Sequence, residues 1–514
     1  MADDRMAGLK AERARLEAGG GEEAARKQHE AGKLTARERL DLLFDKGTFA
    51  EKGLFAEHRC RDFGLDGRDL PADGVVTGSG KIDGRTAFAA SQDFTVVAGT
   101  AAEVHCRKYC SIMDDALRYG RPVVLIEDSG GARIQEGVDS LNGYGEIFYR
   151  NTIMSGVVPQ IAVIAGPCAG GAVYSPALCD FIIMVKGTSQ MFITGPDVIK
   201  AVMGEEVDKD ALGGAEVQTS VSGVAHFMAQ DDRDAIRIAR TLLSYLPSNN
   251  LEEPPRLAGS FDAPPDPKLD SIVPDDPRVG FDMKDVIRSV VDPGSFFEVS
   301  ERFATNFVIG FARLAGRPVG ILANQPLVKA GALDIDASDK AARHIRFCNA
   351  FNVPVVNFVD VPGFLPGVGQ EHGGIIRHGA KMLHAYSAAT VPKITVIVKK
   401  AYGGSYLAMC ARSQGADRVF AWPTAEVAVM GAEMAVPLIF RKELAAAKNA
   451  DKKREELIRE YREKFYNPYR AAARLQVDDV IAPSETRRHV VEALDAVRTK
   501  REALPAKKND NIPL

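Results

Sequence analysis

Short and almost purely apolar runs alternate with longer segments of helical periodicity along this chain. Residues 122–127 (PVVLIE) and 354–359 (PVVNFV) are two such runs, and they have the pattern of strands buried on both faces of a sheet. Each run follows a predicted helix and precedes a glycine-rich loop and a second helix. Strands that alternate with helices predict right-handed crossovers and a parallel sheet. The sequence therefore predicts an α/β fold.

The pattern is written twice. The apolar run 159–165 leads to the tight turn 170–172 (GGA), and the run 392–398 leads to 403–405 (GGS), 233 positions further on. The buried runs described above lie 232 positions apart. An offset that holds this well over many residues indicates internal duplication. Before each buried run, a pair of strands is expected to turn at a Gly-Arg dipeptide.

Length supports two domains, because 514 residues exceed what one hydrophobic core usually supports. The lead-in 44–51 resembles 291–298, so the duplication includes the segment before each sheet. A region rich in proline and acidic residues separates the copies, and a solvated charged helix is expected over 442–464. The predicted parts are a helical segment 1–45, a first domain 46–250, a linker 251–280 and a second domain 281–514.

Composition excludes several classes of function. Apolar residues make up 46% of the chain and charged residues 26%, as in a soluble globular protein. A net charge of -4 and the lack of a basic stripe argue against nucleic-acid binding. Residues 157–185 are strongly apolar, but prolines and glycines interrupt them before they could span a membrane. We therefore expect no membrane insertion.

The seven cysteines are odd in number and form no Cys-x-x-Cys pair, which favours a reducing, cytoplasmic location. Cys106 and Cys110 lie one helical turn apart. Without a second pair nearby, they are interpreted as small core residues and not as zinc ligands. We expect no metal site.

The paired glycine turns are the candidate chemistry. A strand that passes through Gly-Gly-small into a helix leaves amide N–H groups unpaired, and the helix dipole favours an anion there. The alternative is that the glycines only allow close packing. Two such turns suggest two oxyanions, each donor contributing about 2.7–4 kcal/mol in a transition state. The usual nucleophile, phosphate-loop and zinc motifs are missing.

Six motifs carry a family resemblance. They are 129–136 (SGGARIQE), 166–176 (GPCAGGAVYSP), 191–196 (MFITGP), 360–367 (DVPGFLPG), 374–381 (GIIRHGAK) and 422–431 (WPTAEVAVMG). Together the chain resembles the carboxyltransferase (beta) subunit of biotin-dependent acyl-CoA carboxylases, a family that includes propionyl-CoA carboxylase and the methylmalonyl-CoA decarboxylase and transcarboxylase subunits. The resemblance implies two crotonase-like (ClpP/crotonase) ββα-superhelix domains. It also implies a hexamer whose active site lies between the first domain of one subunit and the second domain of another.

The same resemblance assigns roles to residues. Gly171 and Ala172 would hold the enolate oxygen of the acyl thioester, and Gly404 and Ser405 the ureido oxygen of biotin. Carboxybiotin would give carbon dioxide and a biotin anion that removes the α-proton. The further residues implied are Gly130, Gly131, Ala132, Arg133 and Leu407 on the CoA and acyl side, and Pro362, Gly363 and Phe364 on the biotin side.

Several alternatives stay open. Arg133 could form a surface ion pair instead of contacting CoA. His378 could be a general base, although a hydrogen-bonded helix histidine is favoured. Leu407 replaces the aspartate typical of family members acting on propionyl-CoA, so acetyl-CoA, longer acyl-CoA and methylmalonyl-CoA remain open as substrates. Ser405 replaces the more usual alanine but keeps the amide donor.

The chain lacks a Met-Lys-Met biotinylation signature and an ATP-grasp loop. Biotin would therefore be carried by a separate carrier, with a biotin carboxylase or a membrane decarboxylase subunit as a further partner. The main hypothesis is transfer of carbon dioxide from carboxybiotin to the α-carbon of a short acyl-CoA such as propionyl-CoA. The alternative is the reverse chemistry in a methylmalonyl-CoA decarboxylase or transcarboxylase. A non-catalytic CoA-binding scaffold and a biotin-free hydratase are the remaining alternatives.

Overall fold

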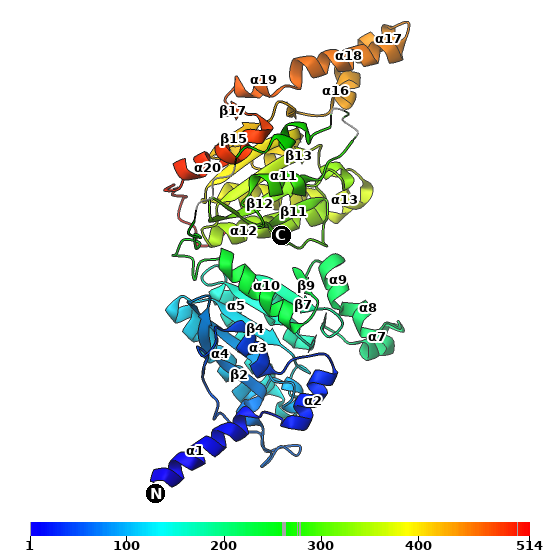
Figure 1. Ribbon diagram of the computed structural model, residues 1–514. Helices are drawn as coiled ribbons and strands as arrows, with labels where there is room; N and C mark the ends of the chain where they lie inside the picture. The colour runs from blue at the N-terminus through cyan, green and yellow to red at the C-terminus, as the bar shows by residue number, and fades with distance from the viewer. Residues whose placement is uncertain (1, 260–263, 275, 277–278, 501) are drawn as a thin grey trace. The chain divides into compact units, whose positions relative to one another are not determined.

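The computed structural model describes the chain except residues 1, 260–263, 275, 277–278 and 501. Two compact units make up the chain, Met1–Glu253 and Pro254–Leu514 (Figure 1). Each contains its own cluster of buried apolar side chains. The predicted linker 251–280 includes several of the residues that lie outside the described part.

The first unit contains ten α-helices and nine strands among its described residues. Its helices are α1 (Ala2–Glu17), α2 (Glu22–Glu30), α3 (Ala36–Leu43), α4 (Glu103–Tyr119), α5 (Val138–Met154), α6 (Tyr174–Leu178), α7 (Pro196–Met203), α8 (Lys209–Gly213), α9 (Ala215–Ser220) and α10 (Asp232–Tyr245). Its strands are β1 (Ala50–Glu51), β2 (Val75–Ile82), β3 (Arg85–Gln92), β4 (Val123–Glu127), β5 (Gln160–Ile164), β6 (Pro167–Ala169), β7 (Phe181–Val185), β8 (Gln190–Phe192) and β9 (Phe227–Ala229).

The second unit follows the same plan. Its helices are α11 (Met283–Val290), α12 (Ile335–Ala350), α13 (Val368–Gly373), α14 (Ile375–Ala388), α15 (Gly403–Ala408), α16 (Ala432–Ile439), α17 (Arg441–Ala446), α18 (Ala450–Phe465), α19 (Pro468–Ala472) and α20 (Thr486–Ala496). Its strands are β10 (Phe297–Val299), β11 (Phe307–Leu314), β12 (Arg317–Asn324), β13 (Val355–Val361), β14 (Lys393–Tyr402), β15 (Arg418–Ala421), β16 (Glu426–Ala428) and β17 (Asp479–Val480).

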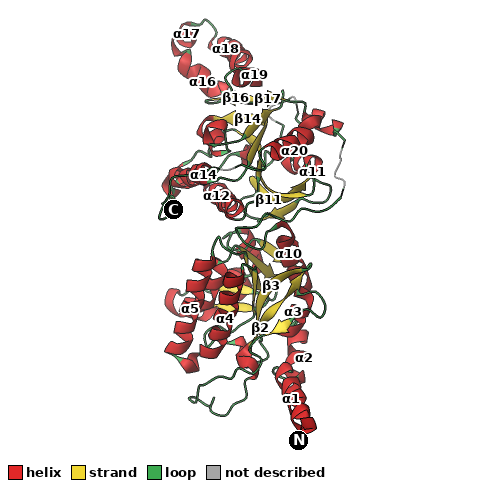
Figure 2. Ribbon diagram, turned by 90° about the vertical axis from the view of Figure 1, so that its left-hand side faces the viewer, coloured by secondary structure: helices red, strands yellow, loops and turns green. Residues whose placement is uncertain are grey.

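The two main sheets have the same strand order. The first runs β1-β2-β3-β4-β5-β7-β9 and the second β10-β11-β12-β13-β14-β15-β17, each with an antiparallel start and a parallel remainder. Every residue of β4 and β13 is buried, as expected for strands covered on both faces. In Figure 2, α4 and α5 lie on one side of the first sheet and α3 and α10 on the other. The predicted duplication and α/β fold are confirmed.

Both predicted Gly-Arg turns are confirmed. Asp83 and Gly84 connect β2 to β3, and Ala315 and Gly316 connect β11 to β12. All four residues have positive φ, between 49° and 79°. This is the type I′ geometry, whose twist matches that of the flanking strands.

The charged helix predicted over 442–464 is divided in two. α17 ends at Ala446, and α18 begins at Ala450 after Asn449, whose side chain accepts a hydrogen bond from the Lys452 amide. An asparagine cap satisfies one of the free amides at a helix start, so the chain gains a new helix there. Within the described residues, no helix is long and apolar enough to cross a bilayer.

Candidate active site

The first glycine turn follows β6. Gly170 has a φ of 66°, in the left-handed region that side chains disfavour, so a glycine is needed for the chain to turn. Gly171 is exposed, and a Cβ atom added to it would meet nothing within 4 Å. Close packing therefore explains neither the identity of Gly171 nor its exposure.

The second turn repeats this arrangement. Gly403 has a φ of 57°, and a Cβ atom there would lie 2.8 Å from the carbonyl oxygen of Val429. Gly404 is exposed, and a Cβ atom added to it would again meet nothing within 4 Å. In both pairs the first glycine is required by the backbone, whereas the second keeps space open.

The strands before the two turns differ. β14 continues unbroken to Tyr402, because β16 pairs with its last residues. In the first unit the chain leaves β5 after Ile164 and forms β6 in a separate small sheet with β8. Pro167, which has no N–H to donate, lies at this break. In the first unit the apolar run 159–165 therefore ends before the turn, and the short strand β6 is the one that passes directly into it.

The amides after each turn are available as donors. The first amides of a helix have no acceptor within it. Among the described residues, none of the hydrogen bonds uses the amides of Gly171, Ala172, Gly404 or Ser405. The helices that follow, α6 and α15, have only 5 and 6 residues. The amides themselves, more than the predicted helix dipole, therefore provide the anion-binding capacity.

We call the amides of Gly171 and Ala172 the first amide cradle and those of Gly404 and Ser405 the second. The hydroxyl of Ser405 adds no donor to the second cradle. Its Oγ donates to the carbonyl oxygen of Tyr402 at 2.7 Å, and the side chain is buried. Ala172 is buried at the corresponding place in the first unit. Both side chains are therefore buried, and the Ser405 hydroxyl is already bonded to the backbone.

A cavity of about 590 Å³ adjoins Gly171. Most of its wall is apolar or aromatic, which suits the acyl and pantetheine parts of a thioester better than a charged group. The residues that line it are Ala132, Arg133, Ile134, Gly137, Leu141, Tyr144, Gly145, Phe148, Gly171 and Tyr174. Tyr144 and Phe148 were not among the predicted site residues, although their spacing of four places them on one face of α5.

The loop 129–133 lies beside this cavity and is held by backbone hydrogen bonds. The Ser129 amide donates to Pro167 at 2.9 Å and the Gly130 amide to Ala98 at 2.9 Å. Gly131 has a φ of 94°, a backbone conformation that residues with a side chain disfavour, so a glycine is needed at this position. Ala132 is exposed on the cavity wall and forms a bridge with Ala101.

The guanidinium of Arg133 points into the fold. It donates to Asp73 at 2.6 Å and Glu136 at 3.0 Å, and its side chain is 0% exposed. The alternative of a surface ion pair is wrong, because this pair is buried. Burial raises the pKa of Asp73, and the nearby Arg133 opposes that rise. Arg133 is thus positioned to hold the loop and not to reach outward.

The corresponding loop of the second unit, which the sequence predicts to lie on the biotin side, has the same backbone bridge but a different surface. Leu333 bridges Phe364 just as Ala101 bridges Ala132 in the first unit. The Phe364 ring lies against α14, where a Cβ on Gly379 would meet its Cζ at 2.9 Å. Pro362 and Gly363 are half-buried. Where the first unit has a small cavity-lining alanine, the second has a phenyl ring packed on a helix.

Two other predicted residues lie on α14 and α15. The Nδ1 atom of His378 is 2.8 Å from Asp339, whose carboxylate also accepts from Lys381 at 2.8 Å. The interpretation of His378 as a hydrogen-bonded helix histidine is confirmed. Leu407 is 39% exposed on α15, three residues after Gly404.

One buried acid was not anticipated. Glu127, the last residue of β4, accepts a hydrogen bond from the Tyr109 hydroxyl at 3.2 Å, and burial raises its pKa to about 7.

All seven cysteines are free thiols, and only Cys60 is not buried. Within the described part of the chain, no group of three or more metal-binding side chains comes together.

Comparison with known proteins agrees with this geometry. Residues 27–512 match the carboxyl transferase domain. The chain is 57% identical over 514 residues to the propionyl-CoA carboxylase carboxyltransferase subunit of Haloferax mediterranei, covering 100% of this chain and 99% of that protein. It is 56% identical over 507 residues to the methylmalonyl-CoA decarboxylase subunit alpha of Propionigenium modestum, covering 98% of each.

A crystal structure of transcarboxylase 12S is also closely similar. That hexamer, with methylmalonyl-coenzyme A and methylmalonic acid bound, superimposes with a TM-score of 0.98 at 58% identity, covering 100% of this chain and 99% of that one. The two units accordingly have the crotonase-like fold expected from the resemblance. The duplicated sheets, the paired glycine turns and the match across nearly the whole length show that the chain is an enzyme that belongs to the carboxyl transferase domain family.

Proposed function

We propose that this chain is the carboxyltransferase subunit of a biotin-dependent acyl-CoA carboxylase. It moves carbon dioxide from carboxybiotin on a separate carrier to the α-carbon of a short acyl-CoA such as propionyl-CoA. The observation that carries this proposal is the open space in front of Gly171 and Gly404, each next to amides without an acceptor. A scaffold that only bound CoA would have no use for the second of these turns.

On the acyl-CoA side, the amides of Gly171 and Ala172 stabilise the enolate oxygen of the thioester. Each donor of this kind contributes about 2.7–4 kcal/mol when charge develops on the oxygen. The backbone of Gly130, Gly131 and Ala132 lies along the CoA. The apolar cavity beside Gly171 receives the adjoining part of the thioester.

On the biotin side, the amides of Gly404 and Ser405 hold the ureido oxygen, with Pro362, Gly363 and Phe364 beside it. The second turn leaves space in front of Gly404, since no described atom lies within 4 Å of a Cβ added there. Carboxybiotin supplies the carbon dioxide and the basic nitrogen that accepts the α-proton. The chain's own task is to orient both reactants and to stabilise negative charge on two oxygens, which explains why no general base of its own is required.

The reverse reaction is the second candidate. The relatives include a methylmalonyl-CoA decarboxylase subunit and a transcarboxylase subunit at nearly the same identity as the carboxylase subunit. Leu407, on the helix after the second turn, also departs from the aspartate of propionyl-CoA enzymes. The identity of the acyl-CoA and the direction of carboxyl transfer therefore have to be determined together.

The carrier, and a biotin carboxylase or membrane decarboxylase subunit, are proposed to be separate chains. A hexamer is proposed for this chain because the similar transcarboxylase 12S is a hexamer. Biotin and the CoA thioester are the organic groups involved, and no metal is proposed. Free thiols throughout suit a cytoplasmic location.

Purified protein tests the proposal directly. With free biotin and methylmalonyl-CoA it should form the decarboxylated acyl-CoA in a biotin-dependent reaction. With an ATP-driven biotin carboxylase, carrier and bicarbonate, propionyl-CoA should instead be carboxylated. Absence of both reactions in a folded preparation would refute the function, and the first reaction alone would favour a decarboxylase or transcarboxylase.

A further inference from the structure

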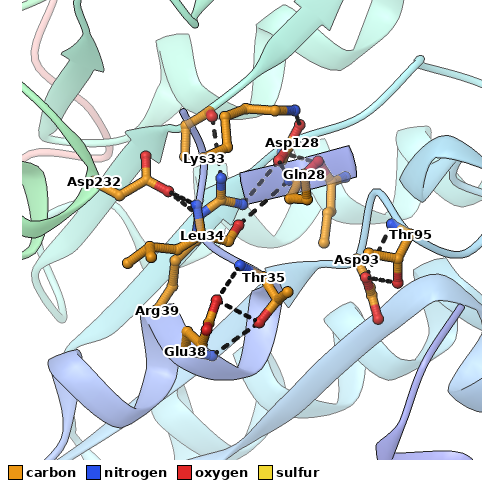
Figure 3. A network of polar contacts seen from close by, with 12 residues as sticks. Gln28, Lys33, Leu34, Thr35, Glu38, Arg39, Asp93, Thr95, Asp128 and Asp232 are labelled. Carbon is orange, nitrogen blue, oxygen red and sulfur yellow. Dashed lines mark hydrogen bonds and ion pairs between the residues drawn. The ribbon is translucent and has the colours of Figure 1, made fainter. Parts of the chain in front are cut away.

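A buried polar cluster joins the N-terminal helices to the first sheet (Figure 3). At its centre Asp128, directly after β4, is fully buried. Its carboxylate accepts from Gln28 Nε2 at 2.6 Å, Lys33 Nζ at 2.8 Å and Arg39 Nη1 at 2.9 Å. We call Gln28, Lys33, Arg39, Asp128 and Asp232 the Asp128 cluster.

Arg39 contacts three different parts of the fold. Besides Asp128, its Nε donates to Asp232 at 2.7 Å and its Nη2 to the carbonyl oxygen of Ala165 at 3.2 Å. Its side chain is 1% exposed. One guanidinium thus connects the end of β4, the end of β5 and the first turn of α10. The planar fork of arginine allows this, whereas an ammonium group is a single point charge.

The strand ends that Arg39 connects lead into the two parts of the proposed acyl-CoA site. Asp128 immediately precedes the loop 129–133, and Ala165 precedes the segment that ends in Gly171. These two segments touch, because the Ser129 amide donates to Pro167. A Cβ atom on Gly166 would lie 1.9 Å from Asp128 Oδ1. The position of the Asp128 carboxylate therefore determines how closely the segments approach.

The N-terminal segment is itself held in place. Thr35 and Glu38 form a capping box at the start of α3. The Leu34 amide donates to Asp232 at 2.8 Å, and the Lys33 ammonium lies 4.1 Å from the centre of the Phe94 ring. Lys33 and Arg39 thus reach the cluster from a backbone that does not depend on Asp128 alone.

Stability alone does not explain a buried set of two carboxylates and two cations. Removing charges from water costs about as much as their attraction returns, so well-packed apolar residues at such sites are often as stable. What ions add is a defined geometry. The location of this geometry, where two loops of the proposed site begin, indicates what it is for.

We infer that Arg39 and Lys33 are positioning residues for the acyl-CoA side. Through Asp128 and Ala165 they fix the spacing between the loop 129–133 and the first glycine turn, so that the amides of both converge on one thioester. This role rests on the proposed function, because it takes the first unit as the acyl-CoA side. It extends that function to a segment far from the glycines in sequence.

The test compares matched substitutions on one helix. Arg39→Lys keeps the charge but replaces the planar fork, whose Nε, Nη1 and Nη2 reach acceptors on three separate segments, by one ammonium group. Arg37→Lys is its control, since Arg37 instead pairs with Glu51 at 2.7 Å. We expect Arg39→Lys to lower kcat/KM for the acyl-CoA by about 10- to 100-fold, with KM for free biotin unchanged within twofold. Arg37→Lys should stay within twofold throughout. Lys33→Met removes one donor and should give a smaller loss of the same kind.

The measurements distinguish a positioning role of the Asp128 cluster from a merely structural one. Equal losses in the acyl-CoA and biotin parameters, or loss in proportion to unfolded protein, would make the cluster merely structural and overturn the inference. Unchanged kcat/KM in a folded Arg39→Lys protein overturns it as well. If Arg39→Lys does not fold, Lys33→Met is judged by the same measurements. A wild-type protein without transfer activity refutes the proposed function, which is thereby separated from failure of the positioning role.

Discussion

Asp128 and Asp360 occupy the same place in two copies of one fold but have different partners. In each copy the aspartate carbonyl lies 2.5 Å from where a Cβ on a left-handed glycine, Gly99 or Gly331, would be. The Asp128 carboxylate binds two cations from the N-terminal segment. The Asp360 carboxylate accepts the Lys400 amide at 3.0 Å and forms no salt bridge within the described part of the chain.

The difference shows that the fold needs the aspartate backbone but not the cations. Burial raises the pKa of Asp360 to about 6, and the nearby Lys400 opposes this rise. The second unit retains its sheet and its glycine turn despite that cost. Lys33 and Arg39 are therefore an addition to the first unit, beyond what the shared architecture requires.

The largest effect should come from filling the cradles separately. Gly171→Val or Gly404→Val places a branched side chain over two amides, and carboxyl transfer should fall at least about 1,000-fold. CoA affinity, measured by calorimetry, should be nearly unchanged in Gly404→Val. Gly8→Val, where a Cβ also meets nothing within 4 Å, is the control. Simultaneous loss of transfer and CoA binding in Gly404→Val would contradict the division between the units.

Asp128→Asn tests the charge balance of the first unit. Lys33 and Arg39 would keep buried positive charge without a full partner, and breaking such a cluster costs about 3–5 kcal/mol. The midpoint of urea unfolding should therefore fall clearly. The double variant Asp128→Asn with Lys33→Met restores the balance and should recover part of the loss. A single variant as stable as wild type would show that the cluster carries no such energy.

Asp360→Asn should stabilise the protein at neutral pH, whereas Asp128→Asn should destabilise it. Because the folded pKa of about 6 exceeds the ordinary 3.8, ionisation opposes folding; the cost is absent below about pH 3.8, grows up to pH 6 and is complete above it. The amide removes this cost, so above pH 7 the variant should be about 2 kcal/mol more stable relative to wild type than it is at pH 4. Unfolding curves at pH 4, 5, 6 and 7.5 measure the difference. A difference that does not change with pH would refute the interpretation.

The smallest expected effect concerns Leu407. Leu407→Asp introduces the aspartate typical of propionyl-CoA enzymes, and should change the ratio of kcat/KM between propionyl-CoA and acetyl-CoA by about tenfold, the scale of one methylene group. Competition assays with both thioesters measure it. A change in biotin KM alone would place Leu407 on the biotin side only.

The sequence predicted the features that depend on local pattern. The hairpin turns, the buried strands and both glycine pairs follow from residue types with few conformational alternatives, and the repeat offset reinforced each of them. The amide cradles could be predicted because no side-chain partner has to be identified for a backbone donor.

What could not be predicted depends on partners distant in the chain. Arg39 and Asp232 are 193 positions apart, and Gln28 and Asp128 are 100 apart, so no periodicity connects them. The inward direction of Arg133 depends on Asp73, 60 positions earlier. The sequence predicts Phe364 as a site residue, but the packing of its ring on Gly379 depends on the position of α14. Such pairings exist only once the sheets have assembled.

The two glycines of each turn are constrained for separate reasons, and this has an evolutionary consequence. Gly403 is fixed by backbone geometry and by its closeness to Val429, whereas a Cβ at Gly404 would lie within 4 Å of no atom of the described residues. A descendant released from selection for chemistry would be expected to keep the inner glycine and to let the outer one drift. Homologues that have lost catalytic activity should thus be recognisable in genomes because they retain the first glycine of the pair but not the second.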